Sequence, residues 1–429
     1  MDAEQLEQIN LLVTSLVGEH KLRTPFLFID QDRVASALRL LRDGLPNVRL
    51  CYAVKANSTP SLIHFFVEQG LTLDVASAGE IISATSIGVP GDRLFLSAPI
   101  KTPETLNKMF THSVACCTVD TLDEVERIYA FRQEKQYTHS PKLFVRLRIK
   151  TSGVEVDLNT KFGCTPTEAI DIIERASRLG MELGGVSFHV GTQCINAGNY
   201  LLGIRTALSV AEEARHRFHV RLPGINIGGG FCDMATAARA GISLPAFYAA
   251  VGKACQEATS AGYEVMAEPG RCLVSDAGGV VTSVSGTNIR DGQRWAYIDD
   301  GIYGCYSIKL YEQHSFEFYR VGPICNKSTN RDPPINGTWV VAGPTCDSLD
   351  VVAKNVTLPL DLSSGDLLYS PNLGAYTVAT ASAFNGFAPP CCYIGHATFR
   401  DGKIDVSIRS NAPVGAPLAT EAKHCPENK

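Results

Sequence analysis

A lysine stands directly after a short apolar run in the stretch Arg49-Leu-Cys-Tyr-Ala-Val-Lys-Ala-Asn57. The run has the composition of a buried strand, and the Asn-Ser-Thr-Pro that follows cannot continue it. An ammonium group at the end of a buried strand is costly unless a partner offsets its burial. Lys55 is therefore expected either to pair with a carboxylate or to act as a nucleophile that forms a Schiff base.

Other apolar runs also end in polar residues or glycine. These positions are Asp74, Arg148, His189, Gly228, Gly229, Gly230 and Glu268. The glycine triplet lets backbone amides approach a phosphate closely, and the nearby Arg271 can add a charged clamp. A lysine, a phosphate cradle and a carboxylate that can pair with a pyridinium nitrogen together describe a site for pyridoxal 5′-phosphate.

Each of these residues also has an ordinary structural explanation. A glycine triplet is more often a turn, and a single histidine at a strand end is more often a satisfied core residue. Arg148 could bridge to a neighbouring acid, and Lys55 could do the same. What favours the functional interpretation is their shared position, because all of them lie where predicted strands end and the following loops begin.

The elements that must position these residues alternate regularly along the chain. Strands are predicted at 50–54, 71–75, 94–97, 115–119, 143–149, 185–189, 224–227 and 264–267, with helices between them, such as 167–179, 199–218 and 244–261. Eight such units over about 220 residues predict a closed (β/α)8 TIM barrel, in which the carboxyl ends of the strands carry the site. An open doubly wound sheet is the alternative, but its dinucleotide-binding fingerprint is absent.

The pattern changes near residue 270. Short apolar segments such as 294–299, 337–342 and 403–408 are separated by Gly, Pro and Asn, which is typical of an all-β domain. We therefore expect a barrel domain at 31–269 and a β-sandwich or β-barrel domain built from 1–30 and 270–410. An exposed loop is expected at 323–336, and a disordered tail at 411–429.

Composition excludes several classes of partner. The formal net charge is −5, which gives no basic field for nucleic acid or an anionic membrane, and no apolar run approaches the roughly 20 residues of a membrane span. The acidic N-terminus is unlike a secretory or mitochondrial leader, so a cytoplasmic enzyme is expected and its fourteen cysteines are read as reduced thiols. No Cys-x-x-Cys pair occurs, and no metal site is expected.

Longer motifs carry a resemblance to a known family. Tyr52-Ala-Val-Lys-Ala-Asn57, Asp74-Val-Ala-Ser77 with Glu80, Lys161-Phe-Gly163, His189-Val-Gly191, Gly228-Gly-Gly-Phe231 and Glu268-Pro-Gly-Arg271 resemble the alanine-racemase-fold pyridoxal phosphate decarboxylases. Asp299-Asp-Gly-Ile-Tyr-Gly304, Gly343-Pro-Thr-Cys-Asp-Ser-Leu-Asp350, Gly374-Ala-Tyr-Thr377 and Phe384-Asn-Gly-Phe387 are similar to the eukaryotic-type ornithine decarboxylases within that fold. The resemblance runs from about Pro25 to Arg400.

The resemblance implies a role for each matching position. Lys55 would carry the cofactor, His189 would stack on its ring, and Glu268 would keep the ring nitrogen protonated. Further cofactor contacts would come from Asp74, Arg148, Thr192, Gly228, Gly229, Gly230, Gly270, Arg271 and Tyr376, with Glu80 in support. Thr192 departs from the family, which more often has Ser there.

The resemblance also implies an obligate homodimer with shared active sites. Cys346 from the second subunit would donate a proton, and Asp347 from the same loop would bind the distal amine of the substrate. Tyr311, Glu312 and Phe384 would complete the substrate pocket, and Lys161 with Asp350 would form an ion pair between subunits.

One departure leaves the substrate open. The family has Asp after the tyrosine that matches Tyr311, whereas this chain has Glu312. The extra methylene moves the carboxylate by about 1.5 Å, and a displacement of that size can cost about a hundredfold in rate. The expected activity is decarboxylation of L-ornithine to putrescine and CO2, or of a closely related basic amino acid.

Three alternatives to that activity are open. They are a paralog acting on lysine or a modified diamino acid, a racemase, and an inactive regulatory homologue. The Cys346 motif argues against a racemase. The presence of both Lys55 and Cys346 argues against the inactive homologue, because such proteins typically lose one of the two.

Overall fold

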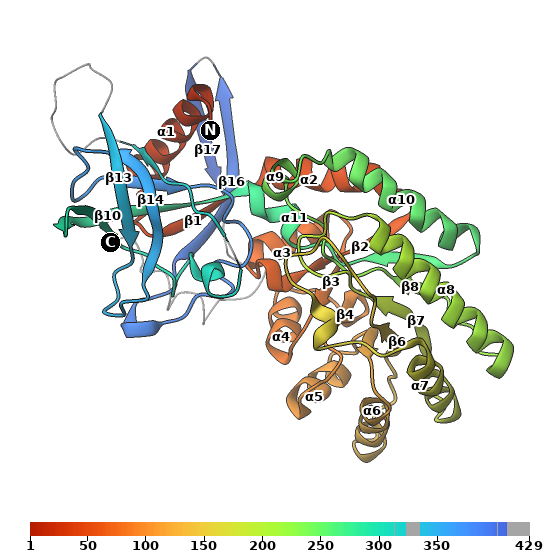
Figure 1. Ribbon diagram of the computed structural model, residues 1–429. Helices are drawn as coiled ribbons and strands as arrows, with labels where there is room; N and C mark the ends of the chain where they lie inside the picture. Colours follow the sequence, from red (N-terminus) through yellow and green to blue (C-terminus); the bar gives the residue numbers. More distant parts are fainter. Residues whose placement is uncertain (313, 323–334, 401, 410–429) are drawn as a thin grey trace. The chain divides into compact units, whose positions relative to one another are not determined.

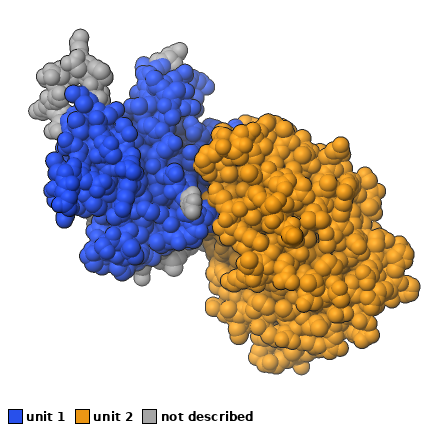
Figure 2. All heavy atoms as spheres, viewed as in Figure 1, with its two compact units in different colours: residues 1–36, 274–429 blue, residues 37–273 orange. Residues whose placement is uncertain are grey.

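The computed structural model describes residues 1–429 except 313, 323–334, 401 and 410–429. The expected tail at 411–429 lies outside the described residues, as does nearly all of the expected loop at 323–336. The chain divides into two compact units, residues 37–273 and residues 1–36 with 274–429 (Figure 2). One unit thus combines an N-terminal segment with a segment from the C-terminal half of the chain.

The first unit is a closed barrel of eight parallel strands in chain order, so the predicted (β/α)8 TIM barrel is confirmed. The strands are β2 (Val48–Ala53), β3 (Thr72–Val75), β4 (Leu94–Leu96), β5 (Cys116–Val119), β6 (Lys142–Leu147), β7 (Leu183–Phe188), β8 (Gly224–Asn226) and β9 (Glu264–Ala267). The α-helices of this part of the chain are α2 (Gln31–Gly44), α3 (Pro60–Glu68), α4 (Ala78–Ser86), α5 (Pro103–Thr111), α6 (Leu122–Glu134), α7 (Pro166–Arg178), α8 (Gly198–Phe218), α9 (Met234–Arg239), α10 (Leu244–Ser260) and α11 (Arg271–Val274). Figure 1 shows most of these helices in a ring around the strands.

Helix α7 illustrates how the local sequence builds this ring. Thr165 and Glu168 form a capping box at its start, and Pro166 occupies the first turn, where its missing N–H costs nothing. Ile170 and Ile173 recur at helical spacing and are buried. The helix therefore has one apolar face, which packs on the barrel strands.

The barrel interior is filled by side chains from several strands. Cys51, Phe95, Cys116, Phe144 and Met266 form one buried cluster, although they come from five different strands. Only the space enclosed by the strands can bring them together, so these positions mark the inward direction of each strand.

The second unit is rich in strands, as predicted, and its strands form one mixed sheet of nine. They are β1 (Phe26–Asp30), β10 (Gly278–Arg290), β11 (Gln293–Ile298), β12 (Tyr319–Val321), β13 (Asn336–Ala342), β14 (Val351–Pro359), β15 (Leu367–Ser370), β16 (Cys391–Arg400) and β17 (Lys403–Ile408). Strand β1 lies between β10, which is antiparallel to it, and β16, which is parallel to it. Helix α1 (Ala3–Gly18) packs Val13 and Leu16 against this sheet.

The cysteines of the described residues are mostly buried free thiols. Cys51, Cys116, Cys117, Cys164, Cys194, Cys255 and Cys305 belong to this group. None of the described helices is long and apolar enough to cross a membrane.

Candidate active site

Lys55 and Asp74 lie together at the carboxyl end of neighbouring barrel strands. Lys55 is in the short 3-10 turn η1 (Val54–Ala56) directly after β2, and its Nζ lies 3.5 Å from Oδ2 of Asp74. The lysine side chain is 40% exposed, whereas that of Asp74 is 1% exposed. The other carboxylate oxygen, Oδ1, has no hydrogen-bond partner among the described residues. The ion-pair interpretation of Lys55 is thus correct, and its amine is still reachable from solvent.

Glu268 is a buried carboxyl group directly after β9. Its Oε1 accepts a hydrogen bond of 2.6 Å from Nδ2 of Asn226. Burial, and then the negative charge of Asp74, raise the pKa of Glu268 to about 7. The hydrogen bond from Asn226 and the charge of Lys55 oppose that rise.

Asn226 was missed by the sequence analysis. It is fully buried at the end of β8, and its Oδ1 accepts a hydrogen bond of 2.9 Å from the amide of Gly228. It therefore connects Glu268 to the glycine loop. The available signal was an amide residue inside an otherwise apolar run, because a buried amide must find partners.

His189 follows β7 and is buried. The amide of Gly191 donates a hydrogen bond of 3.0 Å to its Nδ1, which fixes the remaining ring proton on Nε2. Burial, followed by the positive charges of Arg146 and Lys55, lowers the pKa of His189 well below its usual value. The ring is therefore neutral and can pack flat against an aromatic ligand.

The glycine loop exposes backbone amides. Gly228 and Gly230 adopt φ values of +67° and +90°, and a Cβ on Gly229 would lie 2.5 Å from the carbonyl oxygen of Glu268. Within the described chain, the amides of Gly229 and Gly230 donate no hydrogen bond. Two donors are thus left for an anion.

Three further predicted residues belong to the barrel unit. Arg271 begins α11 and is 6% exposed. A Cβ on Gly270 would lie 3.0 Å from the side chains of Ala53 and Ala56, so glycine permits close packing beside Lys55. Thr192 forms an isolated β-bridge with Val156.

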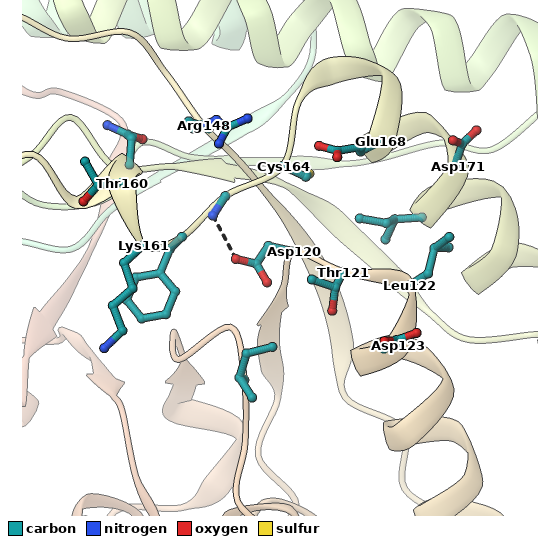
Figure 3. A pocket seen from close by; sticks show the side chains of 15 residues that line it. Asp120, Thr121, Leu122, Asp123, Arg148, Thr160, Lys161, Cys164, Glu168 and Asp171 are labelled. Atoms are coloured by element: carbon teal, nitrogen blue, oxygen red, sulfur yellow. Dashed lines mark hydrogen bonds between the residues drawn. The ribbon is translucent and has the colours of Figure 1, made fainter.

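Arg148 lies in a different part of the barrel end. It lines a cavity of about 770 Å³ together with Asp120 and Lys161 (Figure 3). Oδ2 of Asp120 accepts a hydrogen bond of 2.8 Å from the amide of Gly163, which holds the Lys161-Phe-Gly163 segment at this cavity. The structure thus groups Arg148 with residues after β5 and β6 rather than with the pair of Lys55 and Asp74.

The remaining predicted residues lie in the second unit, where Asp347 is held by two donors. It accepts hydrogen bonds from the hydroxyl of Tyr303 and, at 2.9 Å, from the amide of Leu349. These two bonds lower the pKa of Asp347, the backbone bond having the larger effect.

The ring of Tyr303 packs on Phe384 with centroids 4.3 Å apart. Cys346 is exposed, and its Sγ lies 3.4 Å from Oδ1 of Asn385.

Tyr311 and Tyr376 are joined directly. The hydroxyl of Tyr311 donates a hydrogen bond of 3.1 Å to the carbonyl oxygen of Tyr376. Glu312 follows the turn η5 (Ser307–Leu310), where its amide donates to the carbonyl oxygen of Ile308 at 3.0 Å.

Asp350 is used within its own chain. It is 2% exposed, and its carboxylate accepts hydrogen bonds of 2.9 Å from the amide of Ile302 and 2.7 Å from the hydroxyl of Thr345. The ion pair with Lys161 of a second subunit stays a prediction.

Comparison with known proteins identifies the family. Residues 31–275 match the family model described as "Pyridoxal-dependent decarboxylase, pyridoxal binding domain". This chain belongs to the pyridoxal-dependent decarboxylases. The decarboxylase is 31% identical to the lysine/ornithine decarboxylase of Selenomonas ruminantium over 367 residues, which are 86% of this chain and 88% of that protein. It is also 31% identical to the chloroplastic ornithine decarboxylase of Nicotiana glauca over 395 residues, or 90% and 86% of the two chains.

A solved structure agrees with these relatives. The lysine/ornithine decarboxylase of Vibrio vulnificus, complexed with cadaverine, matches the decarboxylase with a TM-score of 0.78 and 32% identity, over 92% of this chain and 99% of that one. The expected family, fold and cofactor class are therefore confirmed, and the protein is a pyridoxal-phosphate-dependent amino-acid decarboxylase of the ornithine decarboxylase family.

The barrel residues fit the cofactor of this decarboxylase. The two donor amides of Gly229 and Gly230 suit a phosphate, and the buried carboxyl of Glu268 suits a pyridinium nitrogen. The partner-less Oδ1 of Asp74 leaves one acceptor beside Lys55. Among the described residues, no cluster of His, Cys, Asp or Glu could hold a metal ion.

The raised pKa of Glu268 predicts how the stability of the cofactor-free decarboxylase depends on pH. Folding moves this pKa from 4.5 to about 7, so stability from this carboxyl is complete below about pH 4.5 and is lost as the pH rises through 7. Glu268→Gln cannot ionise and should lose less stability than wild type over that interval. Melting temperatures of both cofactor-free proteins at several pH values would measure the difference. If the melting temperatures of both proteins changed with pH in the same way, burial would not oppose the ionisation of Glu268.

Proposed function

We propose that this enzyme removes the α-carboxylate of an amino acid that carries a second, distal amino group, with L-ornithine and lysine as the first candidates. The observation that carries the proposal is Asp347, a half-buried carboxylate whose pKa is held low by hydrogen bonds from the amide of Leu349 and the hydroxyl of Tyr303. Such a group stays ionised and suits an ammonium ion. The relatives that act on ornithine and lysine support the same class.

The barrel residues and Cys346 of the second unit would have different roles in catalysis. When bound, pyridoxal phosphate supplies a conjugated cationic ring that can spread the electron pair left when CO2 departs. Lys55 would hold the cofactor, Glu268 would keep a proton on the ring nitrogen, and the neutral His189 would cover one ring face. The thiol of Cys346 would then deliver a proton to Cα.

We further propose a homodimer in which the Cys346 loop completes the site of the second copy. Several apolar side chains near this loop are exposed in the single chain, namely Leu349 at 70%, Leu310 at 58%, Tyr311 at 46%, Phe387 at 45% and Phe384 at 40%. A group of exposed apolar residues around a catalytic loop supports burial against a partner. The buried free thiols and the net charge of −5 support a cytoplasmic enzyme without nucleic-acid partners.

A lysine-preferring or modified-diamino-acid paralog is the second candidate, because Glu312 replaces the shorter acid of the family. The racemase and the inactive homologue receive no support from the site. Both Lys55 and Cys346 are accessible, as catalysis requires.

The substrate can be tested through Glu312. Release of CO2 from ornithine, lysine, diaminobutyrate and arginine would be measured in parallel by mass spectrometry. We expect wild type to prefer, or to accept equally, a substrate other than ornithine. Glu312→Asp should raise kcat/KM for ornithine relative to that substrate by about tenfold, because a charge-assisted hydrogen bond is worth roughly 1.5–3 kcal/mol.

Glu317→Asp is a suitable control, because it makes the same change at an exposed position of the same segment. A wild-type preference for ornithine that changes less than a few-fold in Glu312→Asp would show that Glu312 folds back and that ornithine is native. Identical kcat/KM values in wild type and Glu312→Ala for every amino acid would show that Glu312 does not touch the substrate.

A further inference from the structure

Cys346 and Asp347 belong to one hairpin loop in the second unit. The loop runs from residue 343 to residue 350 and joins β13 to β14, which pair antiparallel (Figure 1). At its base, the amide of Gly343 donates a hydrogen bond of 2.9 Å to the carbonyl oxygen of Asp350. The residues between these two lie outside both strands, so other contacts must fix the positions of Cys346 and Asp347.

The carboxylate of Asp350 supplies such contacts by accepting three hydrogen bonds from its own chain. Its Oδ2 accepts from the hydroxyl of Thr345 at 2.7 Å and from the amide of Thr345 at 3.1 Å. Its Oδ1 accepts from the amide of Ile302 at 2.9 Å. Hydrogen bonds to a carboxylate are charge-assisted and are about twice as strong as those between neutral groups. The side chain of Asp350 thus connects the end of the loop to its beginning and to the segment that follows β11.

Two glycines pack directly against this carboxylate. A Cβ on Gly301 would lie 2.2 Å from Oδ1 of Asp350, and a Cβ on Gly343 would lie 2.3 Å from either oxygen. These distances are too short for any real contact, so a larger residue at either position would displace the carboxylate. Asp350 itself is 2% exposed. Both segments are therefore packed closely around this one side chain.

The hydrogen bond to Ile302 also fixes a donor on which Asp347 depends. Tyr303 follows Ile302 in the chain, and its hydroxyl donates a hydrogen bond to the carboxylate of Asp347. A shift of the Ile302 backbone would therefore move Tyr303 as well. Asp350 thus acts on the loop in two ways, directly through Thr345 and indirectly through Tyr303.

The resemblance predicts a different role for Asp350, an ion pair with Lys161 of a second subunit. A carboxylate has about four lone-pair positions, and three of them accept from Thr345 and Ile302. Within the described chain, one position is then left for an ammonium group. An ion pair could add to the three hydrogen bonds but would not replace them, because they form in the single chain.

We propose that Asp350 is a positioning residue, which holds Cys346 and Asp347 in place through hydrogen bonds within its own chain. This inference rests on the roles proposed above for these two residues. Cys346 would deliver a proton to Cα while Asp347 binds the distal amine, so the loop must place both groups at once. Loss of the Asp350 carboxylate should therefore lower kcat and raise KM together.

The test compares Asp350→Asn and Thr345→Val with the wild-type holoenzyme. Asp350→Asn keeps the shape of the side chain but presents an NH2 group in place of one acceptor oxygen. We expect it to reduce kcat/KM for the preferred amino acid about a hundredfold, which a displacement of about 1 Å can cause. Thr345→Val, which removes one of the three hydrogen bonds, should cost about tenfold.

Amide hydrogen exchange gives a second readout that does not depend on activity. Exchange in residues 343–350 and 300–304 would be followed by mass spectrometry. In Asp350→Asn it should become about fivefold faster, the factor that one ordinary hydrogen bond contributes to a local opening equilibrium. Asp405→Asn is the matched control and should behave as wild type, because Asp405 is exposed on β17 of the same unit. Circular dichroism would establish folding, and Thr345→Val serves if Asp350→Asn does not fold.

Lys161→Met distinguishes the proposed role from the ion pair. If Asp350 acts within its own chain, the losses in kcat/KM of Lys161→Met and Asp350→Asn should multiply in the double variant. If Lys161→Met alone costs as much as Asp350→Asn and the double variant is no worse than either, the proposal is overturned. Unchanged kcat/KM or unchanged amide exchange in folded Asp350→Asn would overturn it too. If wild type releases no CO2 from the four amino acids, the proposed substrate class fails, and amide exchange alone decides the role of Asp350.

Discussion

Lys55→Ala should abolish turnover, with a loss of roughly a thousandfold or more, together with the visible absorbance of the lysine-bound cofactor. Nζ of Lys55 is the amine that lies in the barrel end beside Asp74, at 3.5 Å from its carboxylate. Borohydride reduction followed by peptide mass spectrometry would locate the modified lysine in wild type. The variant should show no reducible adduct while its circular dichroism is unchanged.

A second variant, Lys55→Arg, distinguishes a loss of catalysis from a loss of stability. Alanine at position 55 leaves the buried carboxylate of Asp74 without this partner, which can lower the melting temperature. Lys55→Arg keeps a positive charge beside Asp74 but cannot form the imine, so it should be equally inactive and more stable. Lys253→Ala, on the exposed side of α10, should behave as wild type. A reducible adduct that persists in Lys55→Ala would assign the cofactor to another lysine.

Mixed subunits should recover activity that neither parent has. Lys55→Ala and Cys346→Ala are each expected to be inactive, because one loses the cofactor anchor and the other the proton donor. If each site takes Lys55 from one chain and Cys346 from the other, random pairing makes half of the dimers mixed. Each mixed dimer then has one intact site, so up to about a quarter of wild-type activity should return.

The control for this experiment pairs two defects within the barrel. A mixture of Lys55→Ala and Glu268→Ala should stay inactive, because every mixed site still contains one damaged barrel. Subunit exchange would be followed with two differently tagged chains in native mass spectrometry. If subunit exchange is demonstrated and the mixture of Lys55→Ala and Cys346→Ala is still inactive, then one chain supplies both residues of a site.

Charged residues at the end of an apolar run were predictable, and a neutral amide at such a position was not. Lys55, Asp74 and Glu268 each interrupt an apolar run, and the barrel topology then requires their ends to meet. Asn226 also faces the site, but it is an uncharged residue at the end of β8, between Ile225 and Ile227. Its direction depends on the register of neighbouring strands, which the order of residues alone does not specify.

In the second unit, the pairing of strands that are far apart in the sequence was also not predictable. Its short strands were recognisable from turn residues, but the parallel pairing of Phe26 with Cys391 joins opposite ends of the chain. No local pattern encodes such a pairing, since only packing in the complete sheet selects it.

The central place of β1 also sets an order of events during synthesis. Strand β1 leaves the ribosome first, yet its neighbours β10 and β16 follow only after the entire barrel has been translated. The barrel is continuous in sequence and can fold as soon as residue 273 has emerged, because domains generally fold as units. Until then β1 has open edges on both sides, and an unprotected strand edge is a template for pairing with other chains. A nascent chain stalled near residue 275 is therefore the species in which this enzyme is most exposed to aggregation.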